Sequence, residues 1–192
     1  MSQRAGAPSA RQTELLEAAY RYVLAHGLAG LSLRPLATAI GSSPRVLLFL
    51  FGTKEGLVRA LLARARADEL ALLAHLTRAG RPVGLADAAE RVWEWLAAAA
   101  HRPLLRLWTE AYARSLVEPD GAWAGFARAA VEDWLEVLAA CQPRAERDGA
   151  DGASRRTLAL AVLRGALLDL LATDDEPRVT AAVRHQLAVL RA

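Results

Sequence analysis

The sequence contains only one cysteine, one methionine and one lysine in 192 residues, and it has no long apolar run. The single Cys141 cannot form a disulfide within the chain. The longest apolar runs, such as residues 46–51 and 95–100, are six residues each, whereas about 18 apolar residues are needed to cross a bilayer. The first dozen residues lack the apolar stretch of an export signal. We therefore expect a cytoplasmic protein that does not enter the membrane.

Motifs that bring reactive groups together are also missing. The four histidines are scattered along the chain, and the sequence has neither an HExxH motif nor paired CxxC motifs. It also lacks a glycine-rich phosphate-binding loop. We therefore expect no enzyme activity, no metal site and no cofactor.

Acidic residues are scarce in the N-terminal third. Residues 1–66 hold nine Arg or Lys against three acids, a net charge of +6, whereas residues 67–192 hold 15 against 18, a net charge of −3. A basic segment on a mildly acidic body favours a polyanionic partner, most simply DNA, because neutralising phosphates releases condensed counterions. An arginine-rich solvated surface is the alternative that charge alone leaves open.

The residues that are abundant favour helices. Only 13 glycines and 8 prolines interrupt a chain rich in alanine and leucine, and strand-forming residues are few. Ser9 followed by Gln12 is a capping-box pattern, and Ser43 followed by Pro44 is a typical helix start. Apolar residues at spacings of three and four then predict an all-α fold of about nine helices, over residues 11–26, 33–40, 44–51, 54–78, 85–100, 104–117, 123–141, 154–172 and 178–190.

The second and third predicted helices, joined by a turn at Gly41, have the length of a helix-turn-helix. Residues 15–57 (LLEAAYRYVLAHGLAGLSLRPLATAIGSSPRVLLFLFGTKEGL) resemble the DNA-binding domain of the tetracycline-repressor (TetR) family. The resemblance includes the LLEAA start, His26-Gly27, Ser32-Leu33-Arg34, Ile40-Gly41, Leu47, Phe51 and Thr53-Lys54-Glu55.

This resemblance implies a homodimeric transcription regulator with an N-terminal DNA-binding domain, residues 1–53, and a C-terminal helical domain, residues 54–192, for effector binding and dimerisation. The expected function is a repressor that binds a palindromic DNA operator and is released by a largely apolar small molecule. The alternative is a helical ligand-binding or scaffold dimer of the same fold that has lost specific DNA binding.

The resemblance implies that Ser32 and Arg34 approach DNA and that Lys54, the only lysine, binds phosphate. Arg45 is the one hydrogen-bonding side chain expected on the exposed face of the third helix; it could bind guanine, while its apolar neighbours could contact only thymine methyls or sugar. In the alternative, this helix lies deeper and part of the face is core. The predicted DNA-binding set is Ser32, Arg34, Ser43, Pro44, Arg45, Val46, Leu48, Phe49, Thr53 and Lys54.

Aromatic residues gather between positions 93 and 134. Aromatics at helical spacing are usually core, but the resemblance implies that some line a pocket, which is mostly apolar with a few polar groups. Arg164, in an apolar helix, could meet an acidic group of a ligand or pair with Asp169 or another acid, and pairing is favoured. The candidate ligand-binding residues are Trp93, Trp108, Tyr112, Trp123, Phe126 and Arg164.

The last two helices have broad apolar faces that could form a four-helix bundle across a two-fold axis, or could complete the core of one chain. A glycine at position 165 suggests a close helix crossing. The predicted dimer interface is Leu158, Val162, Leu163, Gly165, Ala166, Leu167, Leu170, Val179, Ala182, Val183, Gln186, Leu187 and Leu190.

Overall fold

A computed structural model describes residues 9–77 and 83–191. Within these ranges the chain forms ten α-helices and two short 3-10 turns, and it has no strand. This confirms the all-α fold and approximately matches the nine predicted helices. None of the described helices has the length and the hydropathy that are needed to span a bilayer.

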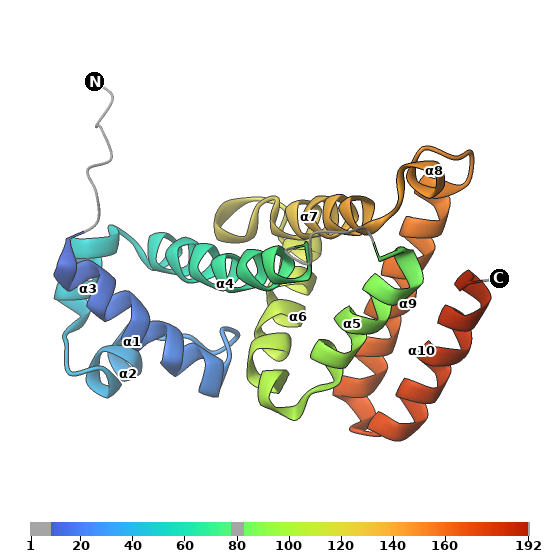
Figure 1. The fold of residues 1–192 in the computed structure, drawn as a ribbon. Helices are drawn as coiled ribbons and strands as arrows, with labels where there is room; N and C mark the ends of the chain where they lie inside the picture. The colour runs from blue at the N-terminus through green and yellow to red at the C-terminus, as the bar shows by residue number, and fades with distance from the viewer. Residues whose placement is uncertain (1–8, 78–82, 192) are drawn as a thin grey trace.

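The first three helices, which we call the head, lie together at one end of the molecule (Figure 1). They are α1 (Ala10–His26), α2 (Leu33–Ala39) and α3 (Pro44–Phe51), close to the predicted ranges. Ser9 caps α1 by accepting a hydrogen bond from the Gln12 amide at 3.2 Å, as its position predicts. The Gln12 side chain does not complete a capping box, because its Nε2 donates to the Leu50 carbonyl at 3.0 Å and so joins α1 to α3.

The starts of α2 and α3 differ in their caps. The Ser43 hydroxyl accepts from the Val46 amide at 3.3 Å, whereas the Ser32 side chain makes no capping hydrogen bond. Beyond α3, a Cβ atom added to Gly56 would lie 2.1 Å from the Phe51 carbonyl oxygen. A glycine is therefore required where the first turn of the next helix passes the end of α3.

A long helix, α4 (Lys54–Thr77), runs from the head to the rest of the chain (Figure 1). Its predicted last residue, at position 78, lies outside the described ranges. The helices and turns that follow are α5 (Leu85–Ala97), η1 (Ala99–His101), α6 (Arg102–Val117), η2 (Gly121–Trp123) and α7 (Phe126–Cys141). Helix α5 ends three residues early and α7 begins three residues late, because 3-10 turns and the positive φ of Gly125, +73°, interrupt the helical path.

The chain ends with α8 (Arg144–Arg147), α9 (Gly152–Thr173) and α10 (Glu176–Arg191). The four-residue α8 lies in a segment predicted as a loop and is too short for an apolar period to show. Helices α5, α9 and α10 pack against one another at the far end from the head (Figure 1). Between α5 and α10, the buried Trp93 Nε1 donates to Thr180 Oγ1 at 2.9 Å. This packing fixes the positions of α5 and α9, which line the pocket described below.

Candidate functional site

One face of α3 is apolar and exposed. Leu47 is only 1% exposed and anchors the helix in the core, whereas Phe49 is 86% exposed. Val46 and Leu48 are exposed by 38% and 40%, and Arg45 is exposed on the same helix. The alternative in which this helix lies deeper and these side chains are core is therefore wrong.

The other predicted DNA-binding residues lie at the first turns of three helices: Ser32 and Arg34 at α2, Ser43 and Pro44 at α3, and Thr53 and Lys54 at α4. Arg34, Arg45 and Lys54 are exposed and form no ion pair with another described residue. The head therefore presents three cationic side chains, on α2, α3 and the start of α4, that are free to meet phosphate or base oxygens.

A polar cluster joins the head to α4. The hydroxyl of the buried Tyr20 on α1 donates to Asp68 Oδ2 at 2.8 Å. The Arg64 guanidinium pairs with Asp68 and, at 2.6 Å, with Glu17 of α1, and it lies 4.8 Å from the centre of the Tyr20 ring. Burial, and then the hydrogen bond to Asp68, raise the pKa of Tyr20 above its ordinary value. The tyrosine therefore stays neutral, and this cluster fixes α1 on α4.

A second contact joins the head to α6. Glu110 Oε2 accepts a hydrogen bond of 2.8 Å from the backbone amide of Leu28, which follows α1. This bond is between a carboxylate and a main-chain amide, so a shift of α6 at this point would move the chain after α1 directly.

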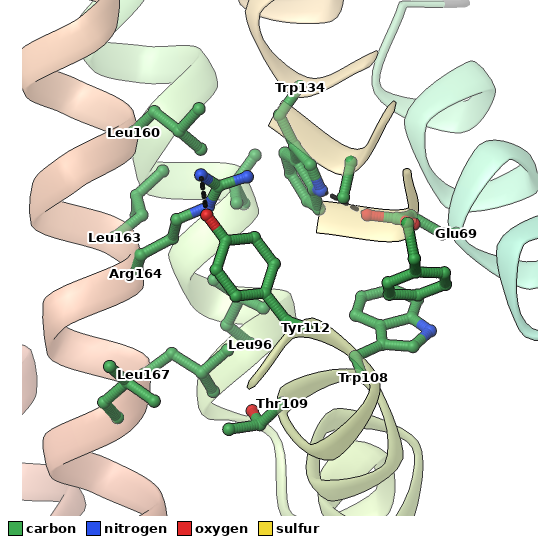
Figure 2. Close-up of a pocket in the computed structure, with 14 residues that line it drawn as sticks. Glu69, Leu96, Trp108, Thr109, Tyr112, Trp134, Leu160, Leu163, Arg164 and Leu167 are labelled. Carbon is green, nitrogen blue, oxygen red and sulfur yellow. Dashed lines mark hydrogen bonds between the residues drawn. The ribbon is translucent and has the colours of Figure 1, made fainter. Parts of the chain in front are cut away.

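A largely apolar pocket lies between α4, α5, α6, α7 and α9 (Figure 2). It contains about 740 Å³ of space not filled by protein atoms, part of it open to solvent. Its lining residues are Glu69, Val92, Leu96, Trp108, Thr109, Tyr112, Phe126, Ala130, Trp134, Leu160, Leu163, Arg164, Leu167 and Leu168. A mostly apolar lining with a few polar groups is typical of small-molecule sites.

Two charged residues line this pocket from opposite sides of the view in Figure 2. Glu69 of α4 is 3% exposed and accepts a hydrogen bond of 2.5 Å from Trp134 Nε1. Burial raises the pKa of the Glu69 carboxyl, although the Trp134 hydrogen bond opposes the effect. Arg164 of α9 donates from Nη1 to the Tyr112 hydroxyl at 3.3 Å. Burial lowers the pKa of its guanidinium from the ordinary value.

The pocket and the head are contacted by neighbouring residues of the same two helices. On α4, Glu69 lines the pocket while Asp68 holds Tyr20 of α1. On α6, Thr109 lines the pocket while Glu110 holds the Leu28 amide. On each helix, the residue that contacts the head is adjacent to one that lines the pocket. A movement of α4 or α6 at the pocket would therefore also move the head.

The comparisons with known proteins agree with this arrangement. Residues 15–61 match the family model described as bacterial regulatory proteins, tetR family. This match covers the N-terminal part of the chain, so the first three helices and the start of α4 resemble the DNA-binding domain of the tetR family. No curated protein matches the chain significantly.

Solved structures extend the likeness in fold over nearly the whole chain. A TetR-family regulator from Cytophaga hutchinsonii has a TM-score of 0.78 at 17% identity, covering 98% of this chain and 96% of its own. A transcriptional regulator from Rhodococcus sp. Rha1 has a TM-score of 0.75 at 21% identity, covering 93% and 95%. The multidrug binding protein EbrR, complexed with imidazole, has a TM-score of 0.68 at 27% identity, covering 94% and 89%.

Four of the six ligand-binding candidates line the pocket, namely Trp108, Tyr112, Phe126 and Arg164. Two do not. Trp93 is 2% exposed and bonded to Thr180 in the core, and Trp123 lies in η2, where the Arg114 guanidinium is 6.0 Å from its ring centre. Helical spacing locates a side chain on a face of its helix, but it does not say which neighbouring helix covers that face.

One further prediction about the pocket is wrong, and two lining residues were missed. Arg164 does not pair with Asp169, whose carboxylate instead binds Arg178 at 2.6 Å. Glu69 and Trp134 line the pocket but were not predicted as ligand-binding residues. Trp134 lies on the same apolar face of α7 as Ala130 and Leu138, which indicated core, and nothing in the spacing marks Glu69.

The predicted dimer interface is also partly corrected. Six of its residues are at most 7% exposed in the single chain and so belong to its own core: Leu163, Leu170, Val179, Val183, Leu187 and Leu190. Half-buried Leu167 lines the pocket. The six others, Leu158, Val162, Gly165, Ala166, Ala182 and Gln186, are exposed or half-buried. An added Cβ at Gly165 would meet no atom within 4 Å, so this glycine makes no close helix crossing within the chain.

Proposed function

We propose that this protein is a ligand-responsive transcriptional repressor of the TetR family. It binds a palindromic operator as a homodimer and is released when a small, largely apolar molecule enters the pocket. The observation that supports this most is the pair of shared helices, since α4 and α6 each contact the pocket and the head through adjacent residues. In this proposal residues 1–53 are the DNA-binding unit, and residues 54–192 bind the effector and form the dimer.

The exposed residues of the head support DNA binding by α2, α3 and the start of α4. In this proposal the exposed Arg34 and Lys54 bind phosphates, and the exposed Arg45 is the donor to a base edge. The apolar remainder of α3, with Phe49 at its most exposed point, contacts thymine methyl groups. Sequence is therefore read by one hydrogen-bonding residue and by apolar contacts.

Release of DNA follows from the geometry of two heads. The recognition helices of a dimer must reach major grooves about 34 to 36 Å apart. A ligand that pushes α4 or α6 outward moves Tyr20 and Leu28 with them and changes this spacing. By linkage, the ligand weakens DNA binding by the same factor by which DNA weakens ligand binding, typically about 1 to 3 kcal/mol. The complexes of EbrR with imidazole and with proflavin are examples of ligand binding on the same fold.

Fluorescence anisotropy with labelled DNA from upstream of the gene, at several salt concentrations, tests DNA binding. The wild type should bind this DNA more tightly than a scrambled duplex, with an affinity that falls steeply as salt rises. Lys54→Ala should weaken binding to both duplexes equally and reduce the salt slope by about 1. Arg184→Ala, which removes an exposed charge from α10, is the matched control. It should leave the affinity for both duplexes and the salt slope unchanged.

A second candidate function is favoured by one observation, the apolar recognition face of α3. In this alternative the protein is a helical ligand-binding or scaffold dimer that has lost specific DNA binding. Equal affinity for the upstream and scrambled duplexes, with ligand binding intact, would support this alternative and contradict the repressor.

A further inference from the structure

Arg164 is a cation without a counterion inside the pocket. Its one hydrogen bond within the described residues goes to the Tyr112 hydroxyl, and no carboxylate of these residues lies within 4 Å of its nitrogen atoms. The residues outside the described ranges carry no acidic side chain. Its helix neighbours in the pocket are leucines. Because a partly buried charge without a partner is unfavourable, the site is complementary to an anion.

The other charged residue of the pocket makes no ion pair with Arg164. Glu69 is almost fully buried and already accepts a hydrogen bond from Trp134, and no contact of 4 Å or less joins it to Arg164 among the described residues. The charge of Glu69 acts on the guanidinium through space, but the effect of burial on the pKa of Arg164 is larger. The guanidinium therefore has no direct carboxylate partner and can meet one on a ligand.

Tyr112 adds a second donor at the same point. Its hydroxyl oxygen accepts from Arg164 Nη1, which leaves its own proton free to donate. Figure 2 shows the Tyr112 ring between Arg164 and Trp108, so both donors lie at one end of a space bounded by rings. A carboxylate can accept from the guanidinium and the phenol together.

The remainder of the pocket is suited to a flat apolar body. Trp108, Phe126 and Trp134 line it together with the Tyr112 ring, and leucines of α9 close the opposite wall. Aromatic rings stack with offset or edge-on geometry and bury large apolar areas.

We propose that the pocket binds an aromatic monocarboxylate, with its carboxylate on the Arg164 guanidinium and the Tyr112 hydroxyl and its ring among Trp108, Phe126 and Trp134. That such a molecule is the effector rests on the proposed function; that it binds does not. Arg164 and Tyr112 thus determine the charge of the ligand, and the aromatic residues determine its shape.

Isothermal titration calorimetry with three matched probes tests the proposal: 2-naphthoate, 2-naphthalenemethanol and 2-naphthylmethylammonium. The wild type should bind the carboxylate most tightly. Arg164→Gln should weaken binding of 2-naphthoate by roughly 10- to 100-fold, the range for a hydrogen bond to a charged group, and leave the alcohol within about 2-fold. Arg164→Lys should retain part of the affinity, and Tyr112→Phe should lose less than Arg164→Gln.

Unchanged alcohol binding shows that the variant pocket is intact, so loss of the carboxylate alone supports the proposal. Tighter binding of the ammonium probe than of 2-naphthoate, no detectable binding of 2-naphthoate, or equal affinity in Arg164→Gln would overturn it. Octanoate, a carboxylate without a ring, tests whether the ligand is aromatic. If octanoate binds more tightly than 2-naphthoate, the aromatic part of the proposal is wrong.

The DNA assay separates this proposal from the proposed function. If 2-naphthoate binds through Arg164 but leaves operator affinity constant, the ligand class stands and this molecule is not an effector. If a neutral or cationic molecule releases DNA and the carboxylate does not bind, the repressor stands and the ligand class is wrong.

Discussion

Glu110 on α6 accepts a hydrogen bond from the backbone amide of Leu28, 82 residues earlier in the chain, at 2.8 Å. The same oxygen lies 3.2 Å from the position that a Cβ atom on Gly27 would occupy. Gly27 ends α1 with a φ of +75°, so it provides both the backbone conformation and the space for the carboxylate. The end of α1 is thus held to α6, which lines the pocket, by a hydrogen bond from the Leu28 amide to the Glu110 side chain.

Removing this acceptor should destabilise the fold. Glu110→Ala leaves the Leu28 amide without its partner, and we expect a loss of about 1 to 3 kcal/mol in the free energy of unfolding. Glu110→Gln should lose less, because its amide oxygen can still accept. Urea unfolding followed by circular dichroism measures both variants. Equal stability of the alanine variant and the wild type would show that the contact contributes nothing.

The exposed phenylalanine of α3 should act in DNA binding and not in folding. Phe49→Ala should change the free energy of unfolding by no more than about 0.5 kcal/mol, because its side chain is 86% exposed. The buried Leu47 is the contrast, and Leu47→Ala should cost about 2 to 5 kcal/mol. Replacing operator thymines by uracil should weaken the wild type and have a smaller effect on Phe49→Ala. If the wild type binds the uracil duplex with unchanged affinity, the proposed contact with thymine methyl groups is wrong.

Trp93 should matter for stability and not for ligand binding. Thr180→Val removes the acceptor of the buried indole N–H, which should cost about 1 to 3 kcal/mol. Combined with Trp93→Phe, which removes the donor, the loss should be smaller than the sum of the two single losses. Neither change should alter the affinity for 2-naphthoate, since Trp93 does not line the pocket. A strong effect of either change on ligand binding would indicate that Trp93 takes part in the binding site.

The stability of the chain should depend on pH through Glu69. Because burial raises the pKa of Glu69 above 4.5 in the folded chain, the folded state holds this proton more tightly than the unfolded state. Its stabilising contribution is complete below pH 4.5 and is lost as the pH rises through the folded-state value.

Glu69→Gln cannot ionise and should escape this loss. Its stability relative to the wild type should therefore rise as the pH increases above 4.5, as measured by denaturant unfolding. Glu132→Gln, on the exposed side of α7, is the control for removing a negative charge. A stability difference that stays constant with pH would contradict the raised pKa.

A second copy of the chain is expected on the outer faces of α9 and α10. Leu158 and Val189 are exposed by 46% and 59% there, and neither lines the pocket. Leu158→Arg combined with Val189→Arg should yield folded monomers in light scattering coupled to size-exclusion chromatography, because unpaired charges would be buried in the interface. Leu116→Arg, at a position 65% exposed on α6, should remain a dimer. Dimers of the double variant would place the interface elsewhere.

The head could be predicted almost completely from the sequence because its signals are local. Ser9 and the Ser43-Pro44 pair start helices through bonds within one turn, and Gly27 stops α1 through its own backbone conformation. The exposure of Phe49 follows from its position relative to Leu47 on one helix. None of these features requires knowledge of a distant segment.

The assignment of faces in the rest of the chain depends on contacts between distant residues. Helix α9 is apolar on most sides, so periodicity alone could not separate the core position of Leu170 from the pocket wall at Leu167 and the open surface at Gly165. The packing of α5, α6 and α10 around it makes that separation.

The same reason explains the errors about individual aromatic and charged residues. The partner of Trp93 lies 87 residues away, and Glu69 and Trp134 are 65 residues apart. Amino-acid order therefore determined the helices, the basic head and the resemblance to the tetR family, since each depends on neighbours within a few turns. Only the tertiary structure decided that Arg164 and Glu69 share one pocket and that Arg164 has no carboxylate within 4 Å, because both follow from how remote helices pack.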